Sequence, residues 1–504
     1  MNVKQAKEYI KNAVKLYLKK DEFGEYRVPV VRQRPIFLLG APGIGKTAIM
    51  EQIAQEMGIA LVSYSMTHHT RQSALGLPFI TQKEYGGAAY SVSEYTMSEI
   101  IASIYETMEE SGWKEGILFL DEINCVSETL APAMLQFLQY KVFGRHRVPE
   151  GWIIVTAGNP PEYNKSVREF DVVTLDRLKV LEVEPDYQVW KEYAAKKRIH
   201  KAILSYLELK KEHFYSMEMA AKGRSYVTAR GWEDLSEILQ LYEEEELPVD
   251  ETLVGQYLRS ERIVKEFTAY YDLYQKYKRD YQIGDILAGM PSQRAVERAK
   301  KAAFDERLSL LGMLLDRVMA DMKQIMEKSA YLSDLRQLLK GVGKAASGDN
   351  GQAVAAQMEK YAEGRRTVLE KQQMANALSD GDRKKHRQVI GFLEEGRREL
   401  SSAGEMQGEA AYGLVKEKYN QEVAQMKQDT GRVQAELHSL FVFAEKAFGE
   451  GNEMLVLVTE LTVDSEGAQF IAAFGSEDYN RHSGELMLSE RRDNIQEQIA
   501  ALNL

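Results

Sequence analysis

A glycine-rich segment near the N-terminus has the residue types and spacing that bind phosphate groups. It reads Gly40-Ala41-Pro42-Gly43-Ile44-Gly45-Lys46-Thr47 and is followed by Ala48. Glycines let the backbone turn so that successive N–H groups point at one anion, with the positive end of a helix behind them. In such a loop the lysine reaches the β- and γ-phosphates and the hydroxyl residue binds Mg²⁺. We expect residues 40–48 to bind a nucleoside triphosphate with Mg²⁺.

Two adjacent acids, Asp121 and Glu122, follow the apolar run 116–120. An uninterrupted apolar run predicts a strand that is buried on both faces. Because side chains alternate along a strand, the two carboxylates cannot do the same job. Asp121 can reach Mg²⁺ through its water shell, and Glu122 can polarise a water molecule aimed at the γ-phosphate. A turn with two solvated acids is the alternative interpretation.

Strands and helices must alternate around these motifs. The sequence predicts strands at residues 36–39, 59–64, 116–120, 151–157 and 179–183. Asn159 follows the fourth of them, and its amide could orient the attacking water, although asparagine before proline is also frequent in plain turns. Because each motif comes at the end of a strand, we expect an open parallel sheet that binds ligands at its carboxyl edge.

Three local features are predicted beside the sheet. Gly86-Gly87 lies between two strand-like runs and indicates a β-hairpin. Thr96 and Glu99 have the spacing of a capping box at the start of a helix. His68 and His69 are adjacent, so in an extended segment they face opposite ways, and we expect hydrogen-bonding or surface histidines rather than a metal site.

Composition excludes several classes of protein. The 504 residues carry a net charge of −11, which argues against a broad surface for nucleic acid or anionic membrane. No apolar run is long enough to span a membrane. The single cysteine, Cys125, rules out an internal disulfide framework and suits a reducing compartment. We expect a cytoplasmic protein.

Taken in order, four motifs resemble those of the AAA+ ATPases, and more narrowly the MoxR-like, dynein-related branch (AAA_5). They are Gly40–Thr47, Asp121–Glu122, Asn159 and Asp176–Arg177. The hairpin at Gly86–Gly87 resembles the helix-2 insert of that branch. The resemblance spans about residues 30–240, and the order of the motifs is more specific than any one of them.

The resemblance implies an α/β P-loop NTPase core with a parallel sheet at 1–184 and a helical lid at 185–288. It further implies ATP and Mg²⁺ as cofactors and a homo-oligomeric ring, which would be a hexamer. Asn159 would be the sensor-1 residue, and Arg177 an arginine finger that enters the neighbouring subunit's site, with Arg168 as the alternative. Arg230 would be the sensor-2 arginine of the lid. A von Willebrand factor A-domain protein would be the partner.

Residues 289–504 lie outside the resemblance. They contain long charged helical patterns with a narrow apolar seam, which is typical of an arm or bundle. The short apolar run 454–458 is interpreted as helix. In the lid, residues 252–281 are predicted to form a helix, and the acids at 243–246 are interpreted as a solvated helix end. No catalytic constellation occurs beyond residue 240, so the extension is expected to bind a partner or client.

The sequence therefore favours an ATP-hydrolysing remodelling chaperone that acts as a ring on a protein client. One alternative is an ATP-gated binding scaffold with incidental turnover. Another is a nucleic-acid-associated motor, which the acidic charge balance makes the weaker hypothesis. A GTPase would need an Asn-Lys-x-Asp motif, and the nearest match, residues 164–167, lacks the aspartate.

Overall fold

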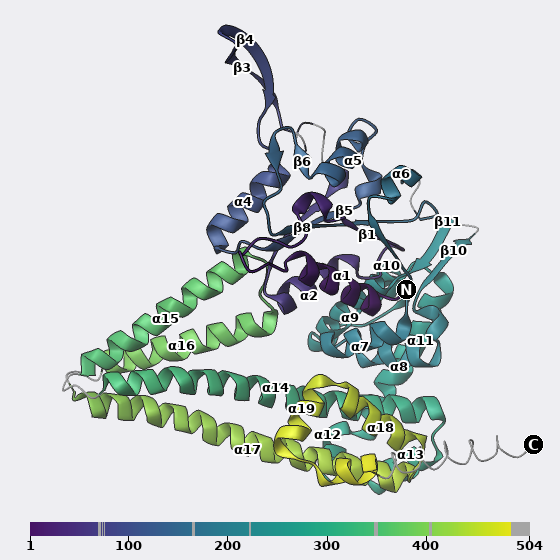
Figure 1. Cartoon of the computed structure of the whole chain (residues 1–504). Coiled ribbons are helices and arrows are strands. Elements are labelled where there is room, and N and C mark those ends of the chain that lie inside the picture. Colours follow the sequence, from purple (N-terminus) through teal and green to yellow (C-terminus); the bar gives the residue numbers. More distant parts are fainter. Residues whose placement is uncertain are drawn as a thin grey trace, which may run out of the picture. The chain divides into compact units, whose positions relative to one another are not determined.

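The computed structural model describes residues 1–68, 72, 74, 76–163, 167–220, 223–346, 351–402 and 406–484. The chain forms two compact units (Figure 1). The first contains Met1–Val189 and Glu363–His386, and the second contains Trp190–Ala362 and Arg387–Leu504. The predicted domain boundaries at 184 and 288 remain predictions.

The first unit is built on a five-stranded sheet with the order β2-β5-β8-β1-β9. Its strands are β1 (Ile36–Gly40), β2 (Ala60–Ser65), β5 (Gly116–Asp121), β8 (Trp152–Gly158) and β9 (Lys179–Val183). Every neighbouring pair is parallel. The predicted parallel sheet is therefore confirmed, and the segments that follow its strands meet at one edge.

Helices pack on this sheet and close its core. They are α1 (Val3–Tyr17), α2 (Lys46–Met57), α4 (Glu99–Ser111), α5 (Ala131–Tyr140) and the short α6 (Val172–Leu175). The three central strands are buried almost throughout, as their apolar runs predict. Packing is close at Gly40, where a Cβ atom would lie 2.6 Å from the backbone oxygen of Val183.

A long hairpin projects from the first unit (Figure 1). It consists of β3 (Pro78–Tyr85) and β4 (Ala88–Tyr95), joined at Gly86 and Gly87, both of which have positive φ. The predicted hairpin is confirmed. A second, short hairpin pairs β6 (Val142–Phe143) with β7 (His146–Arg147). The prediction for His68 and His69 falls outside the described side chains.

The predicted capping box at Thr96 is wrong. The N-cap of α4 is Ser98, and no side chain caps this helix by a hydrogen bond. The Thr96 hydroxyl instead accepts the backbone N–H of Leu77 at 2.8 Å, at the base of the long hairpin. The hairpin thus uses the acceptor that the sequence pattern assigned to the helix.

The second unit begins with helices and a small hairpin. Its first elements are α7 (Tyr187–Lys197), α8 (Lys201–Leu209), β10 (Ser216–Ala220), β11 (Gly223–Val227), α9 (Ala229–Glu244), α10 (Glu251–Tyr257) and α11 (Glu261–Tyr281). The β10–β11 hairpin was not predicted. The single helix predicted over 252–281 is two helices, because Tyr226 and Arg259 exchange backbone hydrogen bonds between them.

The remaining described elements are helices, and two of them, at 351–374 and 380–402, include residues of both units. They are α12 (Ile283–Leu287), α13 (Gln293–Lys301), α14 (Phe304–Ala345), α15 (Gly351–Met374), α16 (Asp380–Ser402), α17 (Gly408–Phe448), α18 (Asn452–Val463) and α19 (Ser465–Phe474). The helix predicted at 454–458 is confirmed within α18. Helices α14 and α17 lie side by side (Figure 1), with Val318, Met322 and Leu437 among the buried residues of their shared core.

Glu243 is not the solvated helix end that the sequence suggested. Its carboxylate accepts hydrogen bonds from His200 at 2.9 Å, Tyr271 at 3.0 Å and Lys278 at 2.8 Å, as well as from Gln275. Burial alone raises the pKa of Glu243, but the hydrogen bonds and charges of His200 and Lys278 outweigh it and hold the pKa well below its usual value of 4.5.

We expect Glu243→Gln to destabilise the second unit in a pH-dependent way. A carboxylate with a lowered folded-state pKa contributes stability above the unfolded-state pKa and loses it as the pH falls. The variant should cost about 2–4 kcal/mol at pH near 7, and the difference from the natural protein should shrink below pH 4.5. Thermal unfolding followed by circular dichroism measures both, with Glu244→Gln on the exposed side of α9 as the control. If the stability difference between the variant and the natural protein were the same near pH 7 and below pH 4.5, the lowered pKa of Glu243 would be contradicted.

Candidate functional site

The glycine-rich loop connects β1 to α2 in the first unit. Gly43 and Gly45 have φ values of 73° and 94°, a conformation that other residues rarely adopt. Gly45 is the N-cap of α2, and neither a capping side chain nor an acid occupies the first turn of that helix. The helix N-terminus therefore presents its N–H groups and the positive end of its dipole to an anion.

Lys46 links the loop to the neighbouring strand. Its side chain is buried, and Nζ donates to the backbone oxygens of Gly40 at 2.8 Å and Ala41 at 2.9 Å and to Oδ1 of Asn159 at 2.9 Å. The structure thus brings together two residues that the sequence separates by more than a hundred positions. An incoming phosphate would compete with these oxygens for the ammonium group, since a charge-assisted bond to phosphate is stronger than one to a carbonyl.

Thr47 and Asp121 offer oxygen atoms beside the loop. The Thr47 hydroxyl donates to Oδ2 of Asp121 at 3.0 Å, and Oδ1 of Asp121 accepts the N–H of Glu122 at 2.9 Å. Hydroxyl and carboxylate oxygens are ligands that Mg²⁺ binds, usually together with water and substrate phosphates. The residues present therefore fit a Mg²⁺ ion, with Thr47 as ligand and Asp121 on its water shell.

Glu122 is held by two hydroxyl groups from the end of β2. Ser65 Oγ and Thr67 Oγ1 both donate to Oε2 of Glu122, at 3.2 and 3.1 Å. Glu122 has a φ of 55°, which turns the chain sharply after β5 and separates its side chain from that of Asp121. Since both bonds go to Oε2, no hydrogen bond from a described residue occupies Oε1. That oxygen is the one available to a water molecule.

Asn124 positions the backbone next to Asn159. Its side chain is buried and donates to the backbone oxygen of Asn159 at 2.8 Å. A Cβ atom on Gly158 would lie 2.5 Å from Oδ1 of Asn124, so only glycine fits there. Asn159 is thereby fixed at both its backbone and its side chain, which also contacts Lys46.

The two candidate arginine fingers differ in position and pairing. Arg177 precedes β9, at the amino edge of the sheet, whereas the loop and acids lie at the carboxyl edge. Its exposed guanidinium makes no hydrogen bond or ion pair with the described residues. Arg168 instead pairs with Glu128, and its N–H donates to the oxygen of Asn124 at 2.9 Å.

Arg230 belongs to the second unit and lies in the first turn of α9. The N-cap of that helix is Thr228, whose hydroxyl accepts the N–H of Gly231 at 3.1 Å. The Arg230 side chain is exposed. Its role as a sensor remains a prediction.

Sequence reasoning did not assign a role to Ser65, Thr67 or Asn124. All three are small polar residues that lie at or within three residues of the carboxyl ends of β2 and β5, as some of the predicted site residues do. That shared position was the sequence signal that could have identified them as site residues. It was insufficient because it does not say that β2 lies next to β5.

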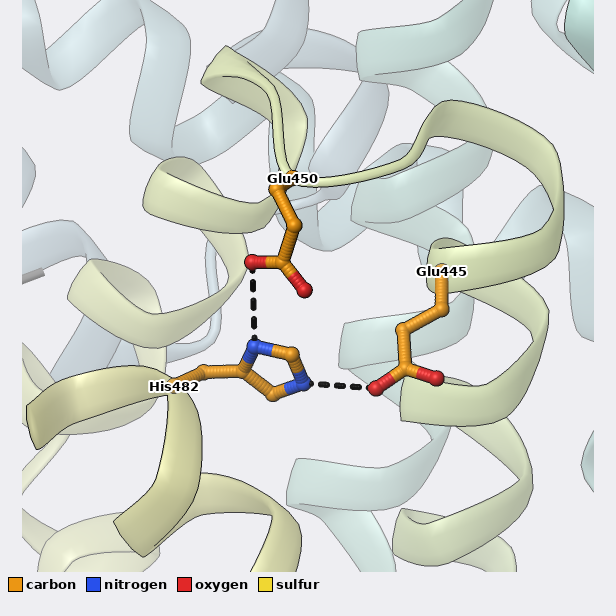
Figure 2. A group of neighbouring side chains, drawn as sticks. All are labelled: Glu445, Glu450 and His482. Atoms are coloured by element: carbon orange, nitrogen blue, oxygen red, sulfur yellow. Dashed lines mark hydrogen bonds and ion pairs between the residues drawn. The ribbon is translucent and has the colours of Figure 1, made fainter. Parts of the chain in front are cut away.

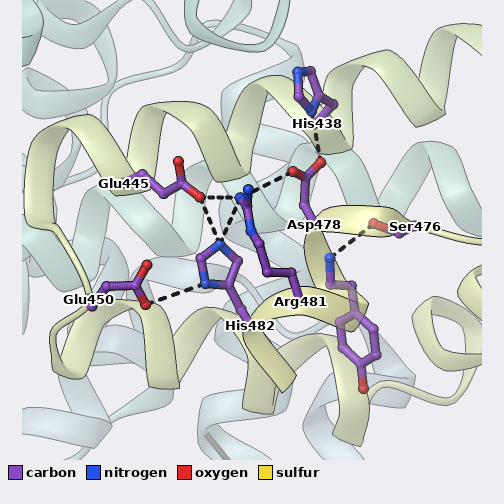
Figure 3. A network of polar contacts seen from close by, with 8 residues as sticks. His438, Glu445, Glu450, Ser476, Asp478, Arg481 and His482 are labelled. Atoms are coloured by element: carbon purple, nitrogen blue, oxygen red, sulfur yellow. Dashed lines mark hydrogen bonds and ion pairs between the residues drawn. The ribbon is translucent and has the colours of Figure 1, made fainter. Parts of the chain in front are cut away.

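A separate group of acids surrounds a histidine in the second unit (Figure 2). Nε2 of His482 lies 2.8 Å from Glu445 and Nδ1 lies 3.4 Å from Glu450, and the imidazole stacks on Phe441. This geometry resembles a metal site. However, Arg481 also contacts Glu445 (Figure 3), so a protein cation already pairs with that carboxylate.

The group continues beyond Arg481. Asp478 binds both Arg481 at 3.4 Å and His438 at 2.7 Å (Figure 3). These pairs attach the helical residues 477–484 to α17. We therefore interpret the group as an ion-pair network that holds the last described helix in place, and assign it no metal.

If Glu122 is the catalytic base, Ser65→Ala combined with Thr67→Ala should lower turnover without weakening nucleotide binding. Neither hydroxyl contacts the phosphate loop, while both orient Glu122. We expect kcat for ATP hydrolysis to fall about tenfold, with KM changed by less than about twofold. Steady-state kinetics measures both, with the exposed hydroxyl change Ser91→Ala on β4 as the control. A rise in KM with kcat unchanged would show that the hydroxyls serve binding instead.

Comparison with known proteins bears on the same segment. In the described part of the chain no helix combines the length and apolar character needed to cross a membrane. Residues 36–173 match the sequence model of the ATPase family associated with various cellular activities (AAA), and no curated protein matches the chain. The matched segment contains the phosphate loop, both acids and Asn159, and domains of this family generally bind and hydrolyse ATP, typically with Mg²⁺. The parallel sheet, its loop and this match together identify an AAA domain in the first unit.

Proposed function

We propose that the protein is an ATP-hydrolysing AAA+ remodelling chaperone of the MoxR-like type. The convergence of Lys46, Thr47, Asp121, Glu122 and Asn159 at one sheet edge is the observation that carries this proposal. Lys46 and the loop bind the phosphates, and Thr47 and Asp121 hold Mg²⁺. Bound Mg²⁺ neutralises charge that develops on the phosphates.

Glu122 and Asn159 are proposed to act on the attacking water. Oε1 of Glu122 accepts a proton from it, since Oε2 is taken by two hydroxyls. Asn159 shares its Oδ1 with Lys46, so phosphate binding by Lys46 would free that oxygen for the water. In this scheme the arrival of the nucleotide prepares the water-orienting group.

The proposed assembly is a ring, with six subunits by resemblance. AAA proteins commonly form rings, and the position of Arg177 supports one, because Arg177 lies at the sheet edge opposite its own site. Val172 and Val173, just before it, are 82% and 59% exposed. Apolar side chains beside an exposed cation suit a subunit interface better than solvent. Arg177 and Arg230 would then neutralise charge on the phosphates of a shared site.

The proposed client is a protein, with a von Willebrand factor A-domain protein as the proposed partner and the cytoplasm as the proposed location. The long hairpin β3–β4 supports a protein client, because it exposes Ile80, Tyr85 and Tyr90 at 77%, 56% and 53%. Exposed aromatic and branched side chains on a projecting element are typical of protein contact sites.

The first test is ATPase rate as a function of protein concentration. We expect the rate per subunit to rise with concentration, and Arg177→Ala to form oligomers of natural size but hydrolyse about 10³-fold more slowly. Arg168→Ala is the matched control, because that arginine already pairs with Glu128. A rate per subunit that stays constant through dilution to monomer, and is indifferent to Arg177, would contradict the ring.

A second test separates the base from the binding groups. Glu122→Gln keeps the size of the side chain but removes the proton acceptor, so turnover should fall by about 10²–10⁴-fold. Binding of a fluorescent ATP analogue and ATP-dependent assembly should persist, because the loop and Lys46 are unchanged. An ATP-gated scaffold predicts the same binding, but it also predicts that client binding does not require turnover. If Glu122→Gln retained natural turnover, Glu122 would not be the base.

A further inference from the structure

Strand β2 is an edge strand of the sheet in the first unit. An edge presents unpaired N–H and C=O groups, and proteins usually cover it. Here the cover is the turn between α15 and α16, residues 375–377, which belongs to the same unit as the sheet. The two segments lie 315 positions apart in sequence.

Leu61 shows how the turn pairs with β2. Its N–H donates to the backbone oxygen of Ala375 at 3.1 Å, and its C=O accepts the Asn376 amide at 3.4 Å. The preceding residue, Ala60, donates in the other direction, to Glu115 next to β5. Both outward-facing polar groups of Leu61 are therefore satisfied by the turn. Ala375 is completely buried and is part of the hydrophobic core of the sheet unit.

The turn is stiffly built. The N–H of Ala377 donates to the Gln372 oxygen at 3.1 Å, and Asn376 has a φ of 50°. Ser379 then caps α16, accepting the N–H of Asp382 at 3.1 Å. These bonds tie the turn to the two helices that it joins, and both helices continue into the second unit by their residue ranges.

The contact is nevertheless a weak one. It provides two hydrogen bonds to β2, one fully buried alanine, Ala375, and one partly buried alanine, Ala377, against the sheet core. Beside it, Oε1 of Gln372 and Nε of Arg383 are buried without a hydrogen-bond partner among the described residues. Each such atom costs about 1–3 kcal/mol. A contact with small gains and unsatisfied polar groups can open and close.

The other end of β2 carries the groups that hold Glu122. Ser65 is the last residue of the strand and Thr67 follows closely, and both donate to Glu122. Leu61 and Ser65 are four residues apart, about 13 Å along a strand. Strand β5 pairs with β2 along its whole length, Ser65 included, so loss of the cover on the outer edge would loosen the carboxyl end of β2 without detaching it.

We propose that docking of the turn 375–377 on β2 positions Glu122 and thereby controls ATP turnover. The inference rests on the proposed ATPase function and adds its regulation. The turn has two states, docked and released, and only the docked state fixes Ser65 and Thr67 against Glu122. A partner that binds α15 or α16 and prefers one state would alter the rate by its differential affinity for the two.

The test uses variants of the turn in the full chain. Ala375→Arg places a charge in the hydrophobic core and should release the turn, while Asn376→Gly tolerates the positive φ and removes only the amide. Ala356→Arg makes the same change at an exposed position of α15 and is the matched control. Amide hydrogen exchange of Leu61, resolved to single residues, reports docking independently of catalysis.

We expect Ala375→Arg to speed exchange at Leu61 by at least about tenfold and to lower kcat by at least about threefold, with KM for ATP nearly unchanged. Asn376→Gly should change the exchange rate at Leu61 and kcat in the same directions but by less. The control Ala356→Arg should change neither quantity. In the Ser65→Ala, Thr67→Ala background, Ala375→Arg should add no further loss of kcat, because the groups through which it acts are gone.

Two results would overturn the inference. One is faster exchange at Leu61 in both turn variants while kcat stays unchanged. The other is that Ala375→Arg lowers kcat by the same factor in the Ser65→Ala, Thr67→Ala background as in the natural protein. If Ala375→Arg fails to fold, Asn376→Gly carries the same comparison. Failure of the proposed function is a separate result, in which the natural protein binds an ATP analogue but releases no phosphate at any concentration.

Discussion

The parallel pairing of β5, β8 and β1 is the constraint on which the site depends. Parallel strands end at one edge, so the phosphate loop, the two acids and Asn159 meet there although they are far apart in the chain. Antiparallel pairing of any one of these strands would send its functional residue to the opposite edge. The buried apolar character of the strands, which also forms the core, is what permits parallel pairing.

In the structure the groups of the site bind one another. Lys46 contacts Asn159, Thr47 contacts Asp121, and Glu122 contacts Ser65 and Thr67. Lys46, the buried charge among them, has three oxygen partners, which avoids the cost of an unsatisfied buried cation. In the proposed function, phosphate would compete for the ammonium group of Lys46 and Mg²⁺ for the hydroxyl of Thr47. The same groups can therefore respond to the presence of the nucleotide.

Sequence reasoning recovered the sheet and the loop because both leave a local pattern. The strands are apolar runs, and the loop has a spacing that few other structures require. It failed where a distant segment decides the outcome. Thr96 has the spacing of a helix cap but serves Leu77, and the break after Tyr257 depends on Tyr226. Glu243 is one of several acids in a row, and only its packing against α11 distinguishes it. The contact of Ala375 with Leu61 cannot be predicted from sequence, because neither alanine nor leucine is a residue type that indicates such a contact.

The late position of the turn 375–377 has a consequence for biosynthesis. A ribosome adds about 5–20 residues per second, so the 315 positions between Leu61 and Asn376 take about 15–60 s to synthesise. During that time the nascent sheet has an open edge at β2, which is a template for pairing with other chains. The long helices α14 and α15 must also be complete before the edge is closed. The growing chain therefore passes through a prolonged aggregation-prone stage, in which general chaperones would be most needed.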